Sequence, residues 1–266
     1  MLKFLVVIVA GFGSGILASV LGVGGAVITT PMIRALGATP IAAVGSTVPA
    51  ILPGAFSGAL RYHREGYIIW PVALTCGLSG MSFAVLGGWV ADLVDARWLM
   101  IVTAVLVMWC GVSLLRDGLR RNAAEHAAAD AGDPIVEGRP IRPRGGVPAM
   151  VALGVGGGFL AGLLGIGGGL ILTPGFTLGL RLPVKHAIAT SLTAVAMMST
   201  TAVVTHIVLG HVDWRFALPL AIGIVPGARV GARITIGSSE QRMRLVAGTL
   251  LIGVAIIYLA GELAAL

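Results

Sequence analysis

Two glycine-rich segments are the parts of this sequence best suited to bind a ligand through the backbone. They read Gly22-Val-Gly-Gly-Ala26 and Gly165-Ile-Gly-Gly-Gly169, and a Thr-Pro pair follows each of them. Glycine lets a backbone approach a ligand closely, and the N–H groups freed where a helix breaks favour an anion. The predicted binding residues here are Gly22, Gly24, Gly25, Gly165, Gly167, Gly168 and Gly169. The alternative is that these glycines only allow helices to pack closely.

Several polar side chains in apolar surroundings are further candidates for the same site. Ser46-Thr47 and Thr190-Ser191 could donate hydroxyl groups to substrate oxygens, or they could bond the helix backbone instead. The guanidinium of Arg229 matches the acceptors of an oxyanion, although it could also extend along its helix to the surface beside Arg233. His206 is either an interface residue or a ligand and proton acceptor.

The composition indicates the kind of chain that carries these residues. Of 266 residues, 57% are hydrophobic and only 11% are charged, and the mean hydropathy is +0.99. Soluble proteins have about 25% charged residues, so the sequence predicts a multi-pass protein of the lipid bilayer and argues against a soluble enzyme. The net charge of +7 is attributed to membrane topology, because no basic face with interleaved aromatic residues indicates a nucleic-acid partner. Cys76 and Cys110 lie in apolar runs and are predicted to be packing residues.

The two glycine segments belong to an internal duplication. At an offset of 143 residues, 11 of the 19 positions in residues 13–31 are identical to those in residues 156–174. A one-residue insertion then moves the offset to 144, which aligns Ser46-Thr47 with Thr190-Ser191 and Gly66 with Gly210. The chain therefore divides into a first transmembrane repeat (1–115), a polar linker (116–146) predicted to be flexible and cytoplasmic, and a second transmembrane repeat (147–266).

Each repeat contains four apolar segments. They cover residues 2–36, 40–60, 67–91 and 98–115, and then 147–180, 183–209, 214–236 and 245–264. The first segment of each repeat is too long for a single span at ~1.5 Å per residue, and glycine and proline interrupt it. A backbone break at membrane depth is tolerated where protein or a water-filled cavity covers it. Residues 22–31 and 165–174 are therefore predicted to be broken or re-entrant helices.

The distribution of Lys and Arg favours a first segment that folds back. If all eight segments cross the membrane, the two sides receive 10 and 8 basic residues; if the first segment of each repeat returns to its own side, they receive 4 and 14. The second arrangement agrees better with the positive-inside rule. It gives each repeat three net crossings, inverts the repeats relative to each other, and places the linker in the cytoplasm and both termini outside.

Other functions remain as alternatives. All 11 acidic residues lie in the linker or at segment ends, whereas a proton or Na⁺ relay normally has a carboxylate in mid-span. No zinc, P-loop or dinucleotide motif is present, so no metal or cofactor is predicted. A duplicated re-entrant element could instead line an anion channel. The stretch from Gly77 to Gly80 looks like the nucleophile motif of rhomboid intramembrane proteases, with His206 as the candidate base for Ser79.

The duplicated motifs resemble a known family. The glycine segments, the paired Ser and Thr residues, and the glycine and tryptophan that follow them (Gly66 and Trp70, Gly210 and Trp214) are similar to the TauE/SafE family of sulfite and organosulfonate exporters. The resemblance covers both halves of the chain and implies export of a small sulfur-containing anion, such as sulfite or sulfoacetate. The first copy departs from the fuller glycine run at Ala26, so the second copy is the better candidate for close approach to a ligand.

The sequence as a whole predicts an all-α polytopic membrane protein of two inverted repeats. Each repeat is expected to have a Gly-rich broken or re-entrant first element followed by three transmembrane helices. The predicted function is secondary transport, by alternating access, of a small anionic substrate out of a cell across a bacterial-type plasma (inner) membrane. No cofactor, metal or nucleic acid is predicted to bind, and a homodimer is left open.

Overall fold

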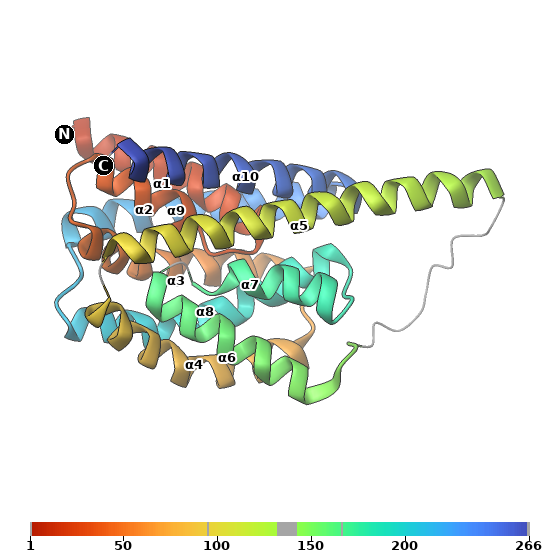
Figure 1. Cartoon of the computed structure of the whole chain (residues 1–266), viewed down its shortest axis with the longest axis horizontal. Helices are drawn as coiled ribbons and strands as arrows, with labels where there is room; N and C mark the ends of the chain where they lie inside the picture. The colour runs from red at the N-terminus through yellow and green to blue at the C-terminus, as the bar shows by residue number, and fades with distance from the viewer. Residues whose placement is uncertain (1, 95, 132–142, 166, 265–266) are drawn as a thin grey trace.

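The computed structural model describes residues 2–94, 96–131, 143–165 and 167–264, and each regular element in these ranges is a helix (Figure 1). The first half contains α1 (Leu2–Leu21), α2 (Ala26–Ala35), α3 (Pro40–Arg64), α4 (Trp70–Leu93) and α5 (Ala96–Ala131). The second half contains α6 (Gly146–Leu164), α7 (Gly169–Pro174), the π-helical turn η1 (Gly175–Gly179), α8 (Val184–Val208), α9 (Trp214–Gly237) and α10 (Glu240–Ala264). Among the described residues, α1, α3, α4, α6, α8 and α9 contain segments long and apolar enough to cross a bilayer. The prediction of an all-helical, multi-pass membrane protein is confirmed.

The long helices lie roughly along one direction, and the first and the last helix have their free ends at the same end of the bundle. Figure 1 shows that α1 begins and α10 ends at one end of the molecule, here called the terminal end. At the opposite end, here called the linker end, α5 finishes and α6 begins. The order of close contacts along each pair shows that α1, α3 and α9 run toward the linker end, while α4, α6 and α8 run toward the terminal end. The spans of α3 and α8 are the most enclosed, and α5 packs against α10.

Small residues hold these helices close together. On α9, three glycines one turn apart face backbone carbonyls of α1, and a Cβ would overlap the facing oxygen: Gly223, Gly227 and Gly231. On α6, a similar set faces α4: Gly154, Gly158 and Gly162. Membrane helices associate through such contacts because the lipid supplies no hydrophobic drive for helix pairing. Helix packing therefore accounts for many of the glycines outside the two duplicated motifs.

The first segment of each half breaks where its glycines predicted. α1 ends at Leu21 and α2 begins at Ala26, and between them Gly22, Gly24 and Gly25 have φ angles of +71°, +88° and +91°. The equivalent glycines between α6 and α7 have φ angles from +65° to +83°. Residues with a Cβ atom rarely adopt this left-handed conformation. Both turns therefore depend on glycine.

After each break the chain returns to the end from which it came. In the first half, Ile33 of α2 belongs to a buried cluster with Val7 near the start of α1 and Ala43 near the start of α3. In the second half, the N–H group of Arg144, just before α6, donates to the carbonyl oxygen of Leu180, just after η1, at 3.1 Å. The breaks are thus folded back into the interior of the helix bundle.

Two boundaries differ from the sequence-based expectation. α5 continues to Ala131, so residues 116–131 are helical rather than a flexible connection; this stretch is rich in Ala and contains no proline, which favours a helix. The later linker residues 132–142 lie outside the described residues. The proline of the first motif also does not end its element, since α2 continues to Ala35. In the second motif α7 ends at Pro174, but the chain passes directly into η1. A π-helical turn is one way in which a helix accommodates such an interruption.

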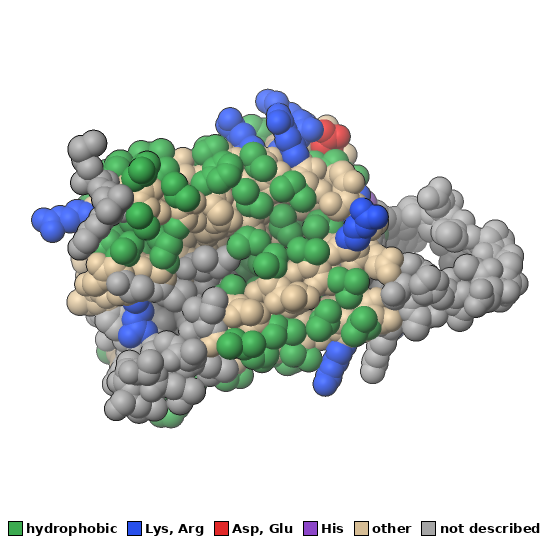
Figure 2. Space-filling model, turned by 90° about the horizontal axis from the view of Figure 1, so that it is seen from above, with side chains coloured by type: hydrophobic (Ala, Val, Ile, Leu, Met, Phe, Trp, Pro, Cys, Tyr) green, Lys and Arg blue, Asp and Glu red, His purple; other side chains and the backbone are tan. Residues whose placement is uncertain are grey.

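The surface agrees with a position in the membrane. Figure 2 shows hydrophobic side chains spread over the middle of one face, while Lys and Arg side chains lie toward its edges. The exposed apolar side chains include several tryptophans, among them Trp89, Trp98 and Trp109. A soluble protein rarely exposes so continuous an apolar surface, whereas a bilayer requires one.

Candidate functional site

The two helix breaks contact each other inside the bundle. Gly169, the first residue of α7, lies so close to the first break that a Cβ atom there would overlap the carbonyl oxygen of Gly22 and lie 2.7 Å from Cα of Val23. Gly22 in turn lies against Thr173 of α7 and Ile188 of α8. The repeat partner of Gly169 is Ala26, which is fully buried but carries its Cβ. Contact with the opposite break is therefore a reason for the extra glycine of the second copy.

Hydroxyl groups of the central helices bind the first glycine of each break. Ser191 of α8 donates to the carbonyl oxygen of Gly22 at 2.9 Å. Thr47 of α3 donates to the carbonyl oxygen of Gly165 at 3.4 Å and to that of Val44 at 2.8 Å. Both hydroxyl-bearing residues are buried. Two of the predicted site residues thus tether the breaks, which lie about 10 Å along α3 and α8 from the ends at which these helices begin.

The neighbouring hydroxyl groups bind the loop that leads into a helix of the opposite half. Ser46 accepts a hydrogen bond from the N–H group of Asp213, the residue before α9, at 2.8 Å. Thr190 accepts one from the N–H group of Ile69, the residue before α4, at 3.1 Å. Ser46 and Thr190 were predicted as substrate-binding residues. Ser46 and Thr190 come one residue before Thr47 and Ser191. In the structure their side-chain oxygens bind backbone N–H groups outside the breaks.

These bonds come in pairs that obey the sequence repeat. The Ser191 and Thr47 bonds join residues equivalent at offsets of 144 and 143, and the Thr190 and Ser46 bonds join residues equivalent at an offset of 144. A third pair places the hydroxyl group of Tyr62 on the carbonyl oxygen of Ser19 at 2.7 Å, and Nε2 of His206 on that of Gly162 at 3.2 Å. The duplication seen in the sequence therefore recurs in the polar contacts between the halves.

Three polar residues at the breaks were not among the predicted site residues. Thr173 donates to Ser191 at 3.1 Å and to the carbonyl oxygen of Gly22 at 3.4 Å. Its repeat partner Thr30 is also buried, but its hydroxyl group has no hydrogen-bond partner among the described residues, and the same holds for Ser199. The Thr-Pro ending of each motif was the signal that could have identified Thr30 and Thr173. Nothing comparable in the sequence marks Ser199.

His206 lies toward the terminal end, against the last turn of α6 before the second break. Its Nδ1 is 3.2 Å from Nδ1 of His211, and its Nε2 is 3.2 Å from the carbonyl oxygen of Gly162, which can only accept. In a neutral pair, Nε2 of His206 therefore carries the proton and its Nδ1 accepts a hydrogen bond from His211. Both rings are buried. The structure places His206 at a contact between α8, the following loop and α6 at Gly162, three residues before the second glycine motif.

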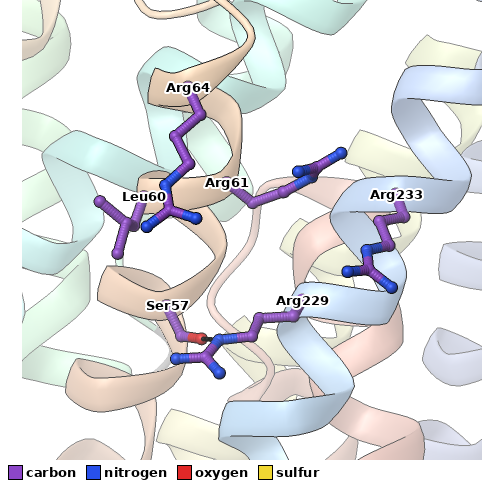
Figure 3. A pocket seen from close by; sticks show the side chains of 6 residues that line it. All are labelled: Ser57, Leu60, Arg61, Arg64, Arg229 and Arg233. Carbon is purple, nitrogen blue, oxygen red and sulfur yellow. Dashed lines mark hydrogen bonds between the residues drawn. The ribbon is translucent and has the colours of Figure 1, made fainter.

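Arg229 lies on the linker side of the bundle. Its Nε donates to the hydroxyl group of Ser57 on α3 at 2.9 Å, so the side chain crosses to the neighbouring helix (Figure 3). The hydroxyl group of Ser57 in turn donates to the carbonyl oxygen of Val225 at 3.1 Å. Of the predicted site residues, the structure thus brings the two glycine breaks together, with Ser191 bonded to the first and Thr47 to the second. His206 lies on the terminal side and Arg229 on the linker side.

The serine and histidine needed by the protease alternative do not form a pair. Ser79 donates to the carbonyl oxygens of Thr75 and Cys76 in its own helix, at 2.8 and 3.2 Å. The ring nitrogens of His206 are bonded to His211 and Gly162. A nucleophilic serine requires its base within hydrogen-bond reach. The motif at Ser79 is accounted for by helix back-bonding.

We predict that Ser191→Ala destabilises the protein more than Thr47→Ala does. Loss of the Ser191 hydroxyl leaves the buried carbonyl oxygen of Gly22 with only the longer Thr173 contact, which costs about 1–3 kcal/mol. Thr47 sits 3.4 Å from its carbonyl oxygen across the bundle, so its loss removes less. Thermal unfolding of both variants in the same detergent measures the difference. An equal shift in Tm for the two would contradict the assignment of Ser191 as the main tether.

Several membrane-crossing helices around two broken helices that meet in the interior define a class of protein, the membrane transport proteins. Comparison with known sequences gives the family. The profile described as Sulfite exporter TauE/SafE matches residues 7–258, and the chain belongs to this family. The family resemblance noted in the sequence is confirmed.

Relatives in distant organisms span the same length. The chain is 28% identical to the probable membrane transporter protein YunE of Bacillus subtilis, over 97% of this chain and 98% of the relative. It is 26% identical to a probable membrane transporter protein of Xylella fastidiosa, over 92% and 89% of the two chains. It is 24% identical to the probable membrane transporter protein MJ0441 of Methanocaldococcus jannaschii, over 92% and 91%. No solved structure matches the chain.

Proposed function

We propose that this protein is a secondary transporter that exports a small sulfur-containing anion, sulfite or an organosulfonate such as sulfoacetate. The contact between the two helix breaks carries the proposal, because broken helices that meet inside a bundle form the substrate site of many secondary transporters. The name of the family supports the substrate class. In this proposal the anion binds to the backbone at the breaks, and Thr47 and Ser191 hold the breaks in position.

The arrangement of helices supports two repeats of inverted orientation. Helix pairs recur when the halves are exchanged: α1 packs on α9 as α6 packs on α4, and α3 packs on α9 as α8 packs on α4. The equivalent helices α1 and α6 run toward opposite ends, and so do α3 and α8. Alternating access then follows from a movement of one group of helices against the other around the breaks.

The basic residues support an orientation with the linker in the cytoplasm of a cell bounded by a plasma (inner) membrane. At or near the linker end, the basic residues in the described part of the chain are Arg61, Arg64, Arg116, Arg120, Arg121, Arg144, Arg181, Lys185, Arg229, Arg233, Arg242 and Arg244. At the terminal end they are Lys3, Arg34, Arg97 and Arg215. Cytoplasmic loops of membrane proteins carry the excess of Lys and Arg.

Export of an anion in this orientation needs no coupling ion. An inside-negative membrane potential contributes about 2.3 kcal/mol per charge for each 100 mV. The absence of acidic residues from the middle of the apolar segments agrees with such a uniporter. Proton coupling through the buried pair His206 and His211 is the alternative within the same function, and a pH gradient imposed without a potential would drive export only in that case.

The proposal is tested by the flux of labelled sulfite and sulfoacetate in proteoliposomes. We expect saturable flux in the wild type and a loss of about tenfold or more in Arg229→Ala, since a charge-assisted hydrogen bond to an oxyanion is worth about 1.5–3 kcal/mol. Flux that survives this substitution would remove Arg229 from the pathway and keep the transporter. If neither anion moves while neutral or cationic solutes do, the substrate class is wrong.

An anion channel is the second candidate. Unsaturable flux with a high unitary conductance would favour a channel, whereas saturation and competition between sulfite and sulfoacetate would favour a carrier. The close contact of Gly169 with the first break favours the carrier, because this conformation has backbone packed against backbone where an open pore would need a continuous gap.

A further inference from the structure

A cavity of about 230 Å³ at the linker side of the bundle is lined by four arginines from two helices. Its lining residues are Ser57, Leu60, Arg61 and Arg64 of α3, and Arg229 and Arg233 of α9. Figure 3 shows Arg61 of α3 and Arg229 of α9 each extending toward the opposite helix. Within each helix the cationic residues follow one another on one face, three or four residues apart. The cavity therefore brings four guanidinium groups close together.

The charges of this cavity are not balanced by the protein. Arg61 pairs with Glu65 at 2.8 Å, and this is the single acidic partner that the described residues supply to the four arginines. Three positive charges are left over. Arg229 is bonded through Nε to the neutral hydroxyl group of Ser57, and the buried Nε of Arg61 has no hydrogen-bond partner among the described residues. Arg64, Arg229 and Arg233 are exposed, so their charges are open to an incoming anion.

The deep side of the cavity adjoins the first helix break. Gly58, next to Ser57, approaches Ser19 of α1 and Leu192 of α8 so closely that a Cβ there would lie 2.7 Å from atoms of both side chains. Leu192 follows Ser191, which binds the carbonyl oxygen of Gly22. The hydroxyl group of Ser19 is buried and has no hydrogen-bond partner among the described residues. The residue next to the cavity lining thus contacts side chains that lie beside the first break, and one of them, Ser19, carries a hydroxyl group without a partner among the described residues.

We infer that the arginine cavity is a second binding site, which captures a small oxyanion carrying two negative charges at the linker end before the anion reaches the breaks. This inference rests on the proposed function. It adds a second binding site, the side of the membrane on which that site opens, and the charge of the anion that it binds. A planar guanidinium presents paired N–H donors to the oxygens of a sulfur or phosphorus oxyanion. The volume suits a group of this size with a few waters, and a bulky apolar substrate would find only Leu60 as an apolar contact.

The site also predicts which form of the substrate is captured. A singly charged anion satisfies one of the three unbalanced cations, whereas a dianion satisfies two and gains from both helices. The movement that opens the contact at Gly58 and Ser19 would then pass the anion to the first break. Arg64 and Arg233, which carry no assigned role at the breaks, act at the capture step only.

The test is the affinity of the full-length protein for sulfate in nanodiscs of phosphatidylcholine, measured by titration calorimetry. We expect the affinity to fall about tenfold in Arg64→Gln and in Arg233→Gln, and to remain unchanged in Arg242→Gln, which removes an exposed charge near the same end but outside the cavity. Because these side chains are exposed and have no hydrogen-bond or ionic partner among the described residues, the variants are expected to fold. Unchanged sulfate affinity in both cavity variants would overturn the inference.

Two further arms separate the inference from its rivals. In one arm, the protein is placed in nanodiscs that contain phosphatidylglycerol. If this lipid competes with sulfate, and the cavity variants lose bound phosphatidylglycerol while their affinity for sulfate is unchanged, the cavity is a lipid-headgroup site and the inference is wrong. In proteoliposomes, the cavity variants are expected to raise KM for sulfite about tenfold with a smaller effect on the maximal rate. An unchanged KM in both variants would reject capture while leaving the transporter intact; sulfate binding without any sulfite flux would reject the transporter while leaving the site.

Discussion

The Gly169→Ala variant is expected to lose most of its transport while the protein remains folded. A Cβ atom at this position would overlap the carbonyl oxygen of Gly22, and both contacting groups are backbone, which cannot rotate away. The two breaks must therefore move apart. Such overpacking costs about 1–3 kcal/mol. When the strain falls on the step that moves the breaks, it corresponds to a roughly ten- to hundredfold loss of rate. Sulfite flux in proteoliposomes at matched protein content measures it.

Two other glycines supply matched controls for this variant. Gly156→Ala lies in α6 with open space around its Cβ, so it is expected to leave both Tm and flux unchanged. Gly158→Ala, two residues later, would overlap the carbonyl oxygen of Gly80 in α4 and is expected to lower Tm as much as Gly169→Ala does. Its flux should fall much less, because the overlap is with α4 and does not push the two breaks apart. Equal loss of flux in Gly158→Ala and Gly169→Ala would show that stability alone explains the effect.

The glycine breaks could be predicted from the sequence because their cause is local. A run of glycine inside a long apolar segment cannot continue a helix without cost, and the duplication showed that both runs have the same role. What the sequence could not give is the contact between the breaks. Gly22 and Gly169 are far apart in the chain, and their contact depends on how two folded-back segments pack.

The hydroxyl groups show a similar limit. Their alignment in the two repeats marked Ser46-Thr47 and Thr190-Ser191 as special, but one member of each pair binds a carbonyl at a break and the other binds an amide before a helix of the opposite half. Adjacent residues on a helix point in directions about 100° apart, so one position decides the partner. That division needed the relative positions of α3 and α8.

Only part of the arginine cavity could be predicted from the sequence. Arg229 was a candidate because it interrupts an apolar run, whereas Arg61 and Arg64 lie at the end of a segment, where charged residues are common. They join Arg229 and Arg233 only because α3 and α9 run side by side in the same direction. The helical part of the linker was missed for another reason: its charges suggested solvent, and solvent exposure does not prevent an Ala-rich sequence from forming a helix.

A pair of cysteine substitutions is expected to give opposite labelling from the two sides of the membrane. Gly66 follows α3 at the linker end, and Gly210, its partner in the sequence repeat, follows α8 at the terminal end. Both are exposed, and a Cβ at either meets nothing within 4 Å. Both also have a positive φ, +74° and +70°, so a cysteine costs about 1–2 kcal/mol at each. Cys76 and Cys110 are buried and should react slowly.

With an impermeant maleimide, Gly210→Cys should be labelled in intact cells and Gly66→Cys only in inverted membrane vesicles. Val147→Cys, exposed at the start of α6, is the control and should behave like Gly66→Cys. Repeats of parallel orientation would place both glycines on the same side and give both variants the same labelling, which would refute the inverted arrangement. Labelling of Gly66→Cys from outside and Gly210→Cys from inside would keep the inversion but reverse the orientation. The arginine cavity would then face the exterior, and the same guanidinium groups would capture an anion for import, because the side on which the cavity opens decides the direction in which capture favours transport.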